Sequence, residues 1–340
     1  MINPQSEAVQ HAVSTTDLRL HAASSWLTEG LRLPVLSIHP LAGDASFRRY
    51  FRVYLPDTCY ILMDAPPDRE NTHAFIAING HLQTAHITSP NMIATNVREG
   101  FLLLEDFGDT LFSSHLNEDN ADSRYHSALQ TLVKIQHLGD LTEYPLPRFD
   151  KAMMLKEMHL FTEWFVIPTR QQPLSEGELT LIRQTFERIA DKIEQFPYCF
   201  VHRDYHSRNL MILANQHIGV LDFQDAVWGP LTYDVVSLLK DCYLEWPRAR
   251  VLHWLSEYHH MLMATDHFPQ LSFDDLLTQF EWVGIQRHLK VMGIFSRLHL
   301  RDHKSAYLKH IPLTKRYLLD ALSGIDELTA FGTWLETCTT

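Results

Sequence analysis

The first part of the chain carries short apolar runs that predict a small β-sheet with one inserted helix. Four stretches have the alternating or continuous apolar pattern typical of strands, at residues 47–55, 60–63, 92–94 and 101–104. Apolar positions at helical spacing predict a helix over residues 72–86. A further helix is expected before residue 30, with Thr16 or Asp17 as its N-cap and Gly30 at its end.

After residue 108 the pattern becomes helical, with one interruption. Helical periodicity covers residues 125–137, 155–165, 179–193 and most of 233–334. The interruption is the segment 200–223, where the apolar runs 211–213 and 218–221 flank Asn215–Gln216. Two short apolar runs on either side of such a turn predict a β-hairpin inside the helical part.

Length and composition agree with a two-part fold. The chain has 340 residues, of which 45% are apolar, enough for a packed core. We predict an α+β fold with two lobes and a cleft between them. The small strand-rich N-lobe spans residues 1–107, and the larger helical C-lobe spans residues 108–340.

The net charge of the chain indicates which classes of binding partner are not expected. Forty-one acidic and 29 basic residues give a formal net charge of −12. Such a field repels phosphate backbones and anionic lipid, so nucleic acid and membrane surfaces are not expected partners, and no obligate protein partner is predicted. The polar N-terminus lacks a signal-peptide pattern, no apolar run reaches membrane-spanning length, and the four cysteines are dispersed. We therefore expect reduced thiols in a cytoplasmic protein.

One segment carries the candidate chemistry. Residues 202–209 fit the pattern H-R-D-x-x-x-x-N, and Asp222 follows Asn209 at the end of an apolar run. Phosphoryl transfer needs a carboxylate that orients the attacking hydroxyl and accepts its proton, which predicts Asp204 as the catalytic base. It also needs oxygen ligands for Mg²⁺, which predicts Asn209, a second catalytic residue, and Asp222 as metal ligands. Asp and Asn are common in turns, but three roles at this spacing favour an ATP-dependent kinase.

Two neighbouring polar residues are expected to support this segment. His202 is predicted to pack the loop without taking part in the chemistry. Asp234 opens a helical segment, where it either caps the helix or accepts backbone N–H groups of the catalytic loop.

These motifs resemble those of the aminoglycoside phosphotransferase-like kinases, relatives of the protein kinases that phosphorylate small hydroxyl compounds. The resemblance extends over nearly the whole chain, through segments 41–52, 63–67, 100–108, 157–164, 221–226, 229–230, 286–290 and 293–295. It implies a protein-kinase-like fold that uses ATP and Mg²⁺ and phosphorylates a small molecule.

Within that family, the chain looks most like the bacterial kinases that phosphorylate the anomeric hydroxyl of the amino sugars N-acetylmuramate and N-acetylglucosamine in cell-wall recycling. By this resemblance, residues 103–107 form the hinge beside the adenine and contribute Glu105 and Phe107. The loop over the ATP phosphates comprises Gly43, Asp44, Ala45, Ser46 and Phe47. Small side chains in such a loop let backbone N–H groups approach phosphate oxygens, although a single glycine before a strand is by itself weak evidence.

The chain departs from the family pattern at two places. No lysine precedes Lys134, so the usual strand lysine that holds the phosphates is absent. Either backbone groups and Mg²⁺ suffice, or an arginine replaces the lysine, with Arg49 and Arg52 as the candidates. Arg48, Arg49 and Arg52 are equally readable as a solvated strand face. After Asp222 comes Phe223-Gln224-Asp225 in place of a D-F-G sequence, so an activation switch of the protein-kinase type is not expected. Asp225 is either a second metal ligand or a residue that faces the sugar.

A separate set of residues is expected to bind the acceptor sugar. The lactyl carboxylate of N-acetylmuramate needs a specific cation in this acidic protein. Arg208 lies in the catalytic loop, and Arg287 and Lys290, with Arg297, lie on one side of a predicted helix. Taken singly, each of these residues is more readily interpreted as a surface charge. Trp228 either stacks on the sugar ring or belongs to the core.

Three competing interpretations remain open at this point. His299 and His303 are spaced like a pair of zinc ligands, but the pattern has Asp302 where the zinc hydrolases need glutamate. The missing lysine is compatible with a nucleotide-binding pseudokinase. A kinase for another acceptor, such as choline, homoserine, a methylthio-sugar or an aminoglycoside, would keep the same catalytic residues.

Overall fold

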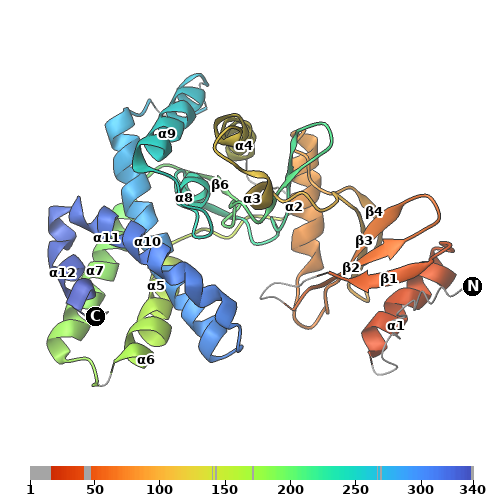
Figure 1. Ribbon diagram of the computed structural model, residues 1–340, viewed down its shortest axis with the longest axis horizontal. Coiled ribbons are helices and arrows are strands. Elements are labelled where there is room, and N and C mark those ends of the chain that lie inside the picture. The colour runs from red at the N-terminus through yellow and green to blue at the C-terminus, as the bar shows by residue number, and fades with distance from the viewer. Residues whose placement is uncertain are drawn as a thin grey trace, which may run out of the picture. The chain divides into compact units, whose positions relative to one another are not determined.

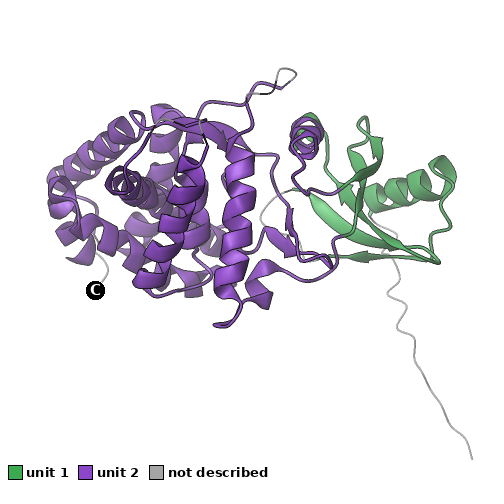
Figure 2. Ribbon diagram, turned by 90° about the horizontal axis from the view of Figure 1, so that it is seen from above, with its two compact units in different colours: residues 1–73, 91–106 green, residues 74–90, 107–340 purple. Residues whose placement is uncertain are grey.

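The structure, a computed structural model, describes residues 17–41, 47–139, 141, 144–170, 172–265, 267–268 and 270–337. It divides into two compact units, coloured separately in Figure 2. The first unit comprises residues 1–73 and 91–106, and the second comprises residues 74–90 and 107–340.

The first unit is built on one antiparallel sheet whose strand order is β1-β2-β3-β5-β4. The strands are β1 (Ser37–Pro40), β2 (Arg49–Tyr54), β3 (Cys59–Asp64), β4 (Met92–Asn96) and β5 (Phe101–Glu105). Four of them coincide with the predicted strands. The short β1 was not predicted, because two of its four residues are exposed and so short a segment shows too little alternation of apolar and polar residues.

One helix covers the core of this sheet. The predicted first helix is α1 (Leu18–Ser25), which continues as a π-helical turn over Trp26–Gly30. Asp17 is its N-cap, since its carboxylate accepts a 3.1 Å hydrogen bond from the N–H of Leu20. The other candidate cap, Thr16, lies outside the described residues. The cluster that joins helix and sheet consists of buried Ala23, Leu27, Phe51, Val53, Leu62, Phe101 and Leu103.

The second unit is mainly helical, and Figure 1 shows its helices around the long helix α10 (Phe273–Leu300). The other helices are α2 (Thr72–Thr84, of which residues 74–84 belong to this unit), α3 (Phe112–His115), α4 (Ala121–Gln136), α5 (Lys151–Leu160), α6 (Ile167–Thr169), α7 (Glu176–Ile193), α8 (Tyr233–Leu239), α9 (Arg248–Met263), α11 (Ile311–Ser323) and α12 (Thr329–Thr337). A π-helical turn, Phe161–Val166, extends α5, and a 3₁₀ turn, Ser305–His310, precedes α11. No helix among the described residues combines the length and the apolar content needed to cross a bilayer.

Helix α10 is buried on nearly every side because it packs against α5, α8 and α11. Gly293 allows the closest of these contacts. A Cβ at this position would lie 2.3 Å from the carbonyl carbon of Leu160, so only glycine fits here. Because α10 is surrounded by other helices, even charged residues along it are buried.

Two small strand pairs in the second unit frame the predicted catalytic segment. The predicted hairpin is present as β7 (Leu210–Ile212) and β8 (Ile218–Val220). The second pair, β6 (Tyr198–Val201) with β9 (Val227–Pro230), was not predicted. Residues 202–209 thus connect β6 to β7, and the segment that holds Asp222 connects β8 to β9. Because β6 pairs with β9 and β7 pairs with β8, the two connections lie side by side.

Candidate active site

The structure brings the three predicted phosphoryl-transfer residues together. The side-chain amide of Asn209 donates a 3.0 Å hydrogen bond to the backbone carbonyl of Asp204. The same nitrogen lies 3.4 Å from Oδ2 of Asp222. The backbone N–H of Leu221 donates to the carbonyl of Asn209 at 2.9 Å, which ties the end of β8 to the end of the loop. Asn209 therefore links the candidate base to the candidate metal ligand.

Two residues of this site adopt the left-handed backbone conformation. Arg203 has φ of 75° and Asp222 has φ of 61°. For a residue with a side chain this conformation costs on the order of 1 kcal/mol, and it persists where the surroundings hold it. The carboxylate of Asp234 supplies part of that hold, because it accepts the N–H groups of His202 at 2.6 Å and of Arg203 at 3.0 Å. Of the two roles predicted for Asp234, bracing the loop is therefore the one observed.

His202 has the structural role that was predicted for it. Its side chain is fully buried, and its Nε2 lies 2.9 Å from the carbonyl oxygen of Leu221. Its ring also packs edge-on against Tyr205, at 5.8 Å between centroids. The imidazole therefore connects the two segments that carry Asp204 and Asp222.

Several cations keep Asp204 ionised. Burial raises the pKa of the Asp204 carboxyl, but the positive charge of Lys290 and of the neighbouring arginines outweighs it, so the pKa lies well below its ordinary value. Asp204 is partly exposed. It is therefore a carboxylate at neutral pH and can accept a hydrogen bond from a hydroxyl group.

A buried carboxylate that sequence reasoning did not single out holds two of these cations. Glu157 on α5 is 7% exposed and forms ion pairs with Arg203 and, at 3.3 Å, with Lys290. Its other oxygen accepts a 3.0 Å hydrogen bond from the amide of Gln286. Burial raises the pKa of Glu157, yet the charges of Lys290 and Arg203 lower it to a net value below the ordinary one. Two sequence signals bear on this role: the acid lies one helical turn after the buried Met154, and it opens the segment 157–164 of the family resemblance.

The oxygen ligands around Asp222 suit a hard divalent cation. The amide of Gln224 donates 2.9 Å hydrogen bonds to Oδ1 of Asp222 and to Oδ2 of Asp225. Asp225 is exposed, and the Oε1 atom of Gln224 is buried without a partner among the described residues. Carboxylate and amide oxygens are the ligands that Mg²⁺ prefers, so Asn209 and Asp222 fit this ion. The geometry leaves both interpretations of Asp225 open.

The histidine pair considered for zinc does not lie on one helix. Helix α10 ends at Leu300, and His303 follows in a left-handed conformation with φ of 56°. Within the described ranges, no group of three or more His, Cys, Asp or Glu side chains is arranged to hold a metal ion.

Of the predicted phosphate loop, the structure describes Phe47. Gly43, Asp44, Ala45 and Ser46 lie outside the described residues. Phe47 is 57% exposed, and its N–H donates a 3.1 Å hydrogen bond to the carboxylate of Glu70. The guanidinium of Arg69 lies 4.7 Å from the Phe47 ring centroid. The end of the loop is thus attached to the segment that precedes α2.

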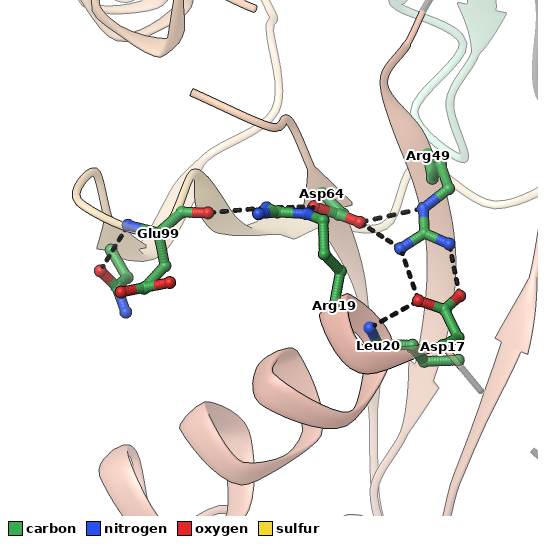
Figure 3. Close-up of polar contacts among 7 residues, drawn as sticks. Asp17, Arg19, Leu20, Arg49, Asp64 and Glu99 are labelled. Atoms are coloured by element: carbon green, nitrogen blue, oxygen red, sulfur yellow. Dashed lines mark hydrogen bonds and ion pairs between the residues drawn. The ribbon is translucent and has the colours of Figure 1, made fainter. Parts of the chain in front are cut away.

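Arg49, predicted as a phosphate contact, is engaged by two carboxylates (Figure 3). Its Nε donates to Asp64 at 2.9 Å, and its Nη2 lies 3.1 Å from an oxygen of Asp17. Arg19 donates to the other oxygen of the buried Asp64 and to the carbonyl of Glu99, at 2.7 Å for the latter. Four alternating charges thus join α1 to the ends of β2 and β3.

The remaining nucleotide candidates also have defined neighbours. Arg52, the alternative to Arg49, donates to Asp106 at 3.1 Å. Glu105 accepts a 2.6 Å hydrogen bond from the amide of Asn91. Phe107, in the second unit, packs against β8, where a Cβ at Gly219 would lie 2.8 Å from its ring. Both candidate arginines therefore already have carboxylate partners.

The predicted acceptor residues differ in their surroundings. Arg287 and Lys290 are 3% and 7% exposed, so the interpretation of these two as surface charges is wrong. Lys290 donates to the hydroxyl of Tyr233 at 3.1 Å, and Arg287 lies 3.7 Å from the sulfur of Cys242. Trp228 on β9 is partly exposed. Arg208 is partly buried, and its guanidinium carbon lies 3.6 Å from the ring centroid of Tyr243.

Comparison with known proteins identifies the family of this chain. Residues 37–271 match the model of the phosphotransferase enzyme family, and the chain belongs to that family. One relative is the N-acetylmuramate/N-acetylglucosamine kinase of Pseudomonas aeruginosa, which is 39% identical over 93% of this chain and 96% of its own length. The proteins of the same name from Pseudomonas putida and Neisseria meningitidis are each 36% identical, over 93% and 82% of this chain and 95% and 83% of their own.

Solved structures share the fold at low sequence identity. Choline kinase LicA from Streptococcus pneumoniae matches with a TM-score of 0.64 and 14% identity, over 88% of this chain and 99% of its own. Aminoglycoside phosphotransferase APH(2'')-Ib, solved with ADP, matches with a TM-score of 0.60 and 13% identity, over 86% and 96%. The predicted α+β fold of the kinase type is confirmed, as is the predicted class of enzyme, a kinase.

Proposed function

We propose that this chain transfers the γ-phosphoryl group of ATP to the anomeric hydroxyl of N-acetylmuramate and N-acetylglucosamine, in the cytoplasm, as a step in the reuse of cell-wall sugars. The observation that carries the proposal is the convergence of Asp204, Asn209 and Asp222 in a chain whose relatives bear the name of this kinase. ADP in the related aminoglycoside phosphotransferase supports an adenine nucleotide as phosphoryl donor.

Asp204 acts as the base in this proposal. Its low pKa keeps it ionised, so it accepts a hydrogen bond from the sugar hydroxyl and aims the oxygen at the γ-phosphorus. A carboxylate of low pKa is a weak base, but an anomeric hydroxyl is more acidic than an ordinary alcohol. The demand on Asp204 is therefore mainly to position the hydroxyl, and the proton passes to its carboxylate as the new P–O bond forms.

Asn209 and Asp222 hold the metal in this proposal. Mg²⁺ bound between them would neutralise the negative charge of the transferring phosphoryl group. Asn209 would use its Oδ1 atom for this, because its amide nitrogen already donates to the Asp204 carbonyl. Gln224 holds Asp222 and Asp225 through one amide nitrogen and so fixes the direction of the carboxylates.

The nucleotide is assigned to the first unit and the hinge. Backbone N–H groups of residues 43–47 would face the phosphates, and Glu105 and Phe107 would border the adenine. Arg49 remains the proposed phosphate contact, and a phosphate there would compete with Asp17 and Asp64 for its guanidinium.

The test is a coupled assay of ADP release with a panel of free hexoses, amino sugars, choline and an aminoglycoside. We expect Mg²⁺-dependent turnover with the two N-acetylated amino sugars and a phosphorus NMR signal of a sugar 1-phosphate. Phosphate on the 6-hydroxyl would refute the anomeric assignment and leave the kinase intact. Turnover of choline alone would refute the substrate class.

The variant Asp204→Asn tests the base directly. We expect kcat to fall by about 10²–10⁴-fold, the usual contribution of a positioned general base, while the KM for ATP changes little. The thermal midpoint of the variant controls for misfolding. Near-normal turnover of Asp204→Asn would remove the proposed base.

A further inference from the structure

Neighbouring side chains of the catalytic loop contact different residues. Asn209 extends toward Asp222, the proposed metal side. Arg208, one residue earlier, extends to Tyr243, in the connection between α8 and α9. His206 lies on the same ring, at 5.3 Å between centroids. Arg208 and His206 therefore share Tyr243 as a contact, whereas Asn209 contacts the candidate metal ligand.

Arg208 is held in place from two directions. Its guanidinium carbon lies 3.6 Å from the Tyr243 ring centroid, and its Nη2 lies 3.4 Å from Nε2 of His310. His310 in turn contacts Tyr243 edge-on, at 4.9 Å between centroids. Asp241 fixes both partners of the stack, because it accepts the N–H of Ser207 at 3.0 Å and the N–H of Tyr243 at 2.8 Å.

Within the part of the chain that the structure describes, no carboxylate oxygen lies within ion-pair distance of the Arg208 guanidinium. Arg203, five residues earlier in the same loop, is paired with the buried Glu157. Burial, with the charges of Arg208 and Lys309, lowers the pKa of His310 although the nearby Asp241 acts to raise it, so the imidazole is neutral and accepts from Arg208. A partly buried, oriented cation without a counter-ion is suited to bind an anion from outside the chain.

A second cation lies along the same segment. Arg287 on α10 is 3% exposed and lies 3.7 Å from the sulfur of Cys242, the residue that precedes Tyr243. It too has no carboxylate within ion-pair distance among the described residues. The short segment 241–243 is therefore bordered by two arginines, neither of which forms an ion pair with a carboxylate among the described residues.

We propose that Arg208, held against Tyr243 and His310, binds the carboxylate of an anionic acceptor and thereby sets the preference for N-acetylmuramate over N-acetylglucosamine. The inference rests on the proposed function. The two sugars differ by the lactyl ether on the 3-hydroxyl, so only N-acetylmuramate presents a carboxylate. A guanidinium binds a carboxylate through two parallel hydrogen bonds, and the ring of Tyr243 fixes the plane in which they form.

The experiment compares kcat and KM for both sugars at saturating MgATP in the full-length wild type and in Arg208→Gln. We expect the KM for N-acetylmuramate to rise on the order of 10- to 100-fold in Arg208→Gln, as for the loss of a charge-assisted pair, and far less for N-acetylglucosamine. The ratio of the two kcat/KM values should shift by the same factor. In Arg208→Lys, which keeps the charge but not the planar guanidinium, the KM for N-acetylmuramate should lie between the values of the wild type and of Arg208→Gln. Arg183→Gln is the matched control, because Arg183 is exposed on α7.

A second variant guards against a folding defect in Arg208→Gln. His310→Phe keeps an aromatic ring at the same place and removes the nitrogen that holds Arg208, so it should shift the ratio in the same direction by a smaller factor. An equal loss with both sugars, together with a higher KM for ATP, would assign Arg208 to the nucleotide phosphates and overturn the inference. If the ratio of the two kcat/KM values is unchanged in Arg208→Gln and in His310→Phe, the contacts of Arg208 serve packing only, and the inference is overturned as well. Failure of the proposed function looks different, since the wild type itself would then turn over neither sugar.

Discussion

Individual residues of the site show how burial and charge act against each other. Asp204 and Asp234 both belong to the catalytic loop network, yet their pKa values move in opposite directions. Cations surround Asp204 and lower its pKa, whereas burial dominates at Asp234 and raises its pKa to about 6. The two carboxylates thus differ because side-chain cations outweigh burial at Asp204, whereas at Asp234 burial outweighs the charge of His202 and the backbone N–H groups of His202 and Arg203.

The raised pKa of Asp234 predicts a pH-dependent contribution to stability. Because the folded-state pKa of about 6 exceeds the ordinary value of 3.8, the folded chain binds this proton more tightly than the unfolded chain. The contribution is therefore fully present below pH 3.8 and is lost as the pH rises through about 6. The free energy of unfolding of the wild type minus that of Asp234→Asn, measured in urea, should fall across this window. A difference that does not depend on pH would contradict the raised pKa.

Some residue roles could be predicted from sequence and others could not. Asp204, Asn209 and Asp222 share a loop and a hairpin, so local spacing was enough to expect them together. Glu157 lies 46 positions before Arg203, and only the folded helices bring the two into contact. Arg287 and Lys290 were open to interpretation as surface charges because a local pattern does not reveal that α10 is surrounded.

Elements were predictable where their own periodicity reveals them. Helices such as α4 and α7 bury one side, which leaves a regular 3.6-residue pattern in the sequence. Strands β6 and β9 have four residues each, and their pairing joins Val201 to Val227 across the catalytic loop and the hairpin. A pairing of that kind is a tertiary property, and neither strand carries enough alternation to indicate it.

The contact between α5 and the catalytic loop yields a prediction for Glu157. In Glu157→Gln the ion pairs to Arg203 and Lys290 lose their buried acid, so the free energy of unfolding should fall by about 3 kcal/mol. Because Arg203 then positions the loop less well, kcat should fall by about tenfold with little change in the KM for ATP. Glu163→Gln, on the exposed side of the π-helical turn that follows α5, is the matched control. Loss of stability with an unchanged kcat would leave Glu157 as a packing residue only.

The crossing of α10 and α5 yields a prediction for Gly293. A Cβ there would lie 2.3 to 2.5 Å from backbone atoms of Leu160 and Phe161, which cannot move aside as a side chain can. Gly293→Ala should therefore lower the free energy of unfolding by about 2 kcal/mol or more, despite the better helix propensity of alanine. Gly284→Ala on the same helix is the control, since the atoms nearest to a Cβ there belong to the side chains of Lys240 and Val236 and lie 3.8 Å away. Equal stability of the two variants would show that α10 and α5 can separate at no cost.

At the scale of the whole molecule, the chain divides its chemistry between two compact units. The catalytic loop, the hairpin and the proposed metal ligands all belong to residues 107–340, whereas Arg49 and Phe47 belong to the first unit. The strand-rich first part and helical second part were predictable from the change in periodicity near residue 108. The sequence pattern placed the helix at 72–86 in the N-lobe, while its residues from 74 onward group with the second unit. That assignment depends on contacts between distant segments, such as the ring of Phe75 against Phe223 at 4.8 Å.

If nucleotide and metal bind as proposed, the stability of the whole molecule should respond to MgATP through Asp222. A ligand present at about 100 times its dissociation constant stabilises the folded chain by about 2.7 kcal/mol, measurable as a shift of the urea midpoint. We expect ATP with Mg²⁺ to stabilise the wild type more than ATP with EDTA, because Asn209 and Asp222 would hold the metal and the metal would neutralise phosphate charge. Asp222→Asn should lose this Mg²⁺-dependent increment and keep the remainder, whereas Asp274→Asn, an exposed acid in the first turn of α10, should keep both. An increment in Asp222→Asn as large as in the wild type would remove Asp222 from the metal site.

The same measurement on Asp225→Asn distinguishes the two roles considered for Asp225. If Asp225 is a second metal ligand, the variant should lose part of the Mg²⁺-dependent increment. If Asp225 faces the acceptor, the variant should keep the increment.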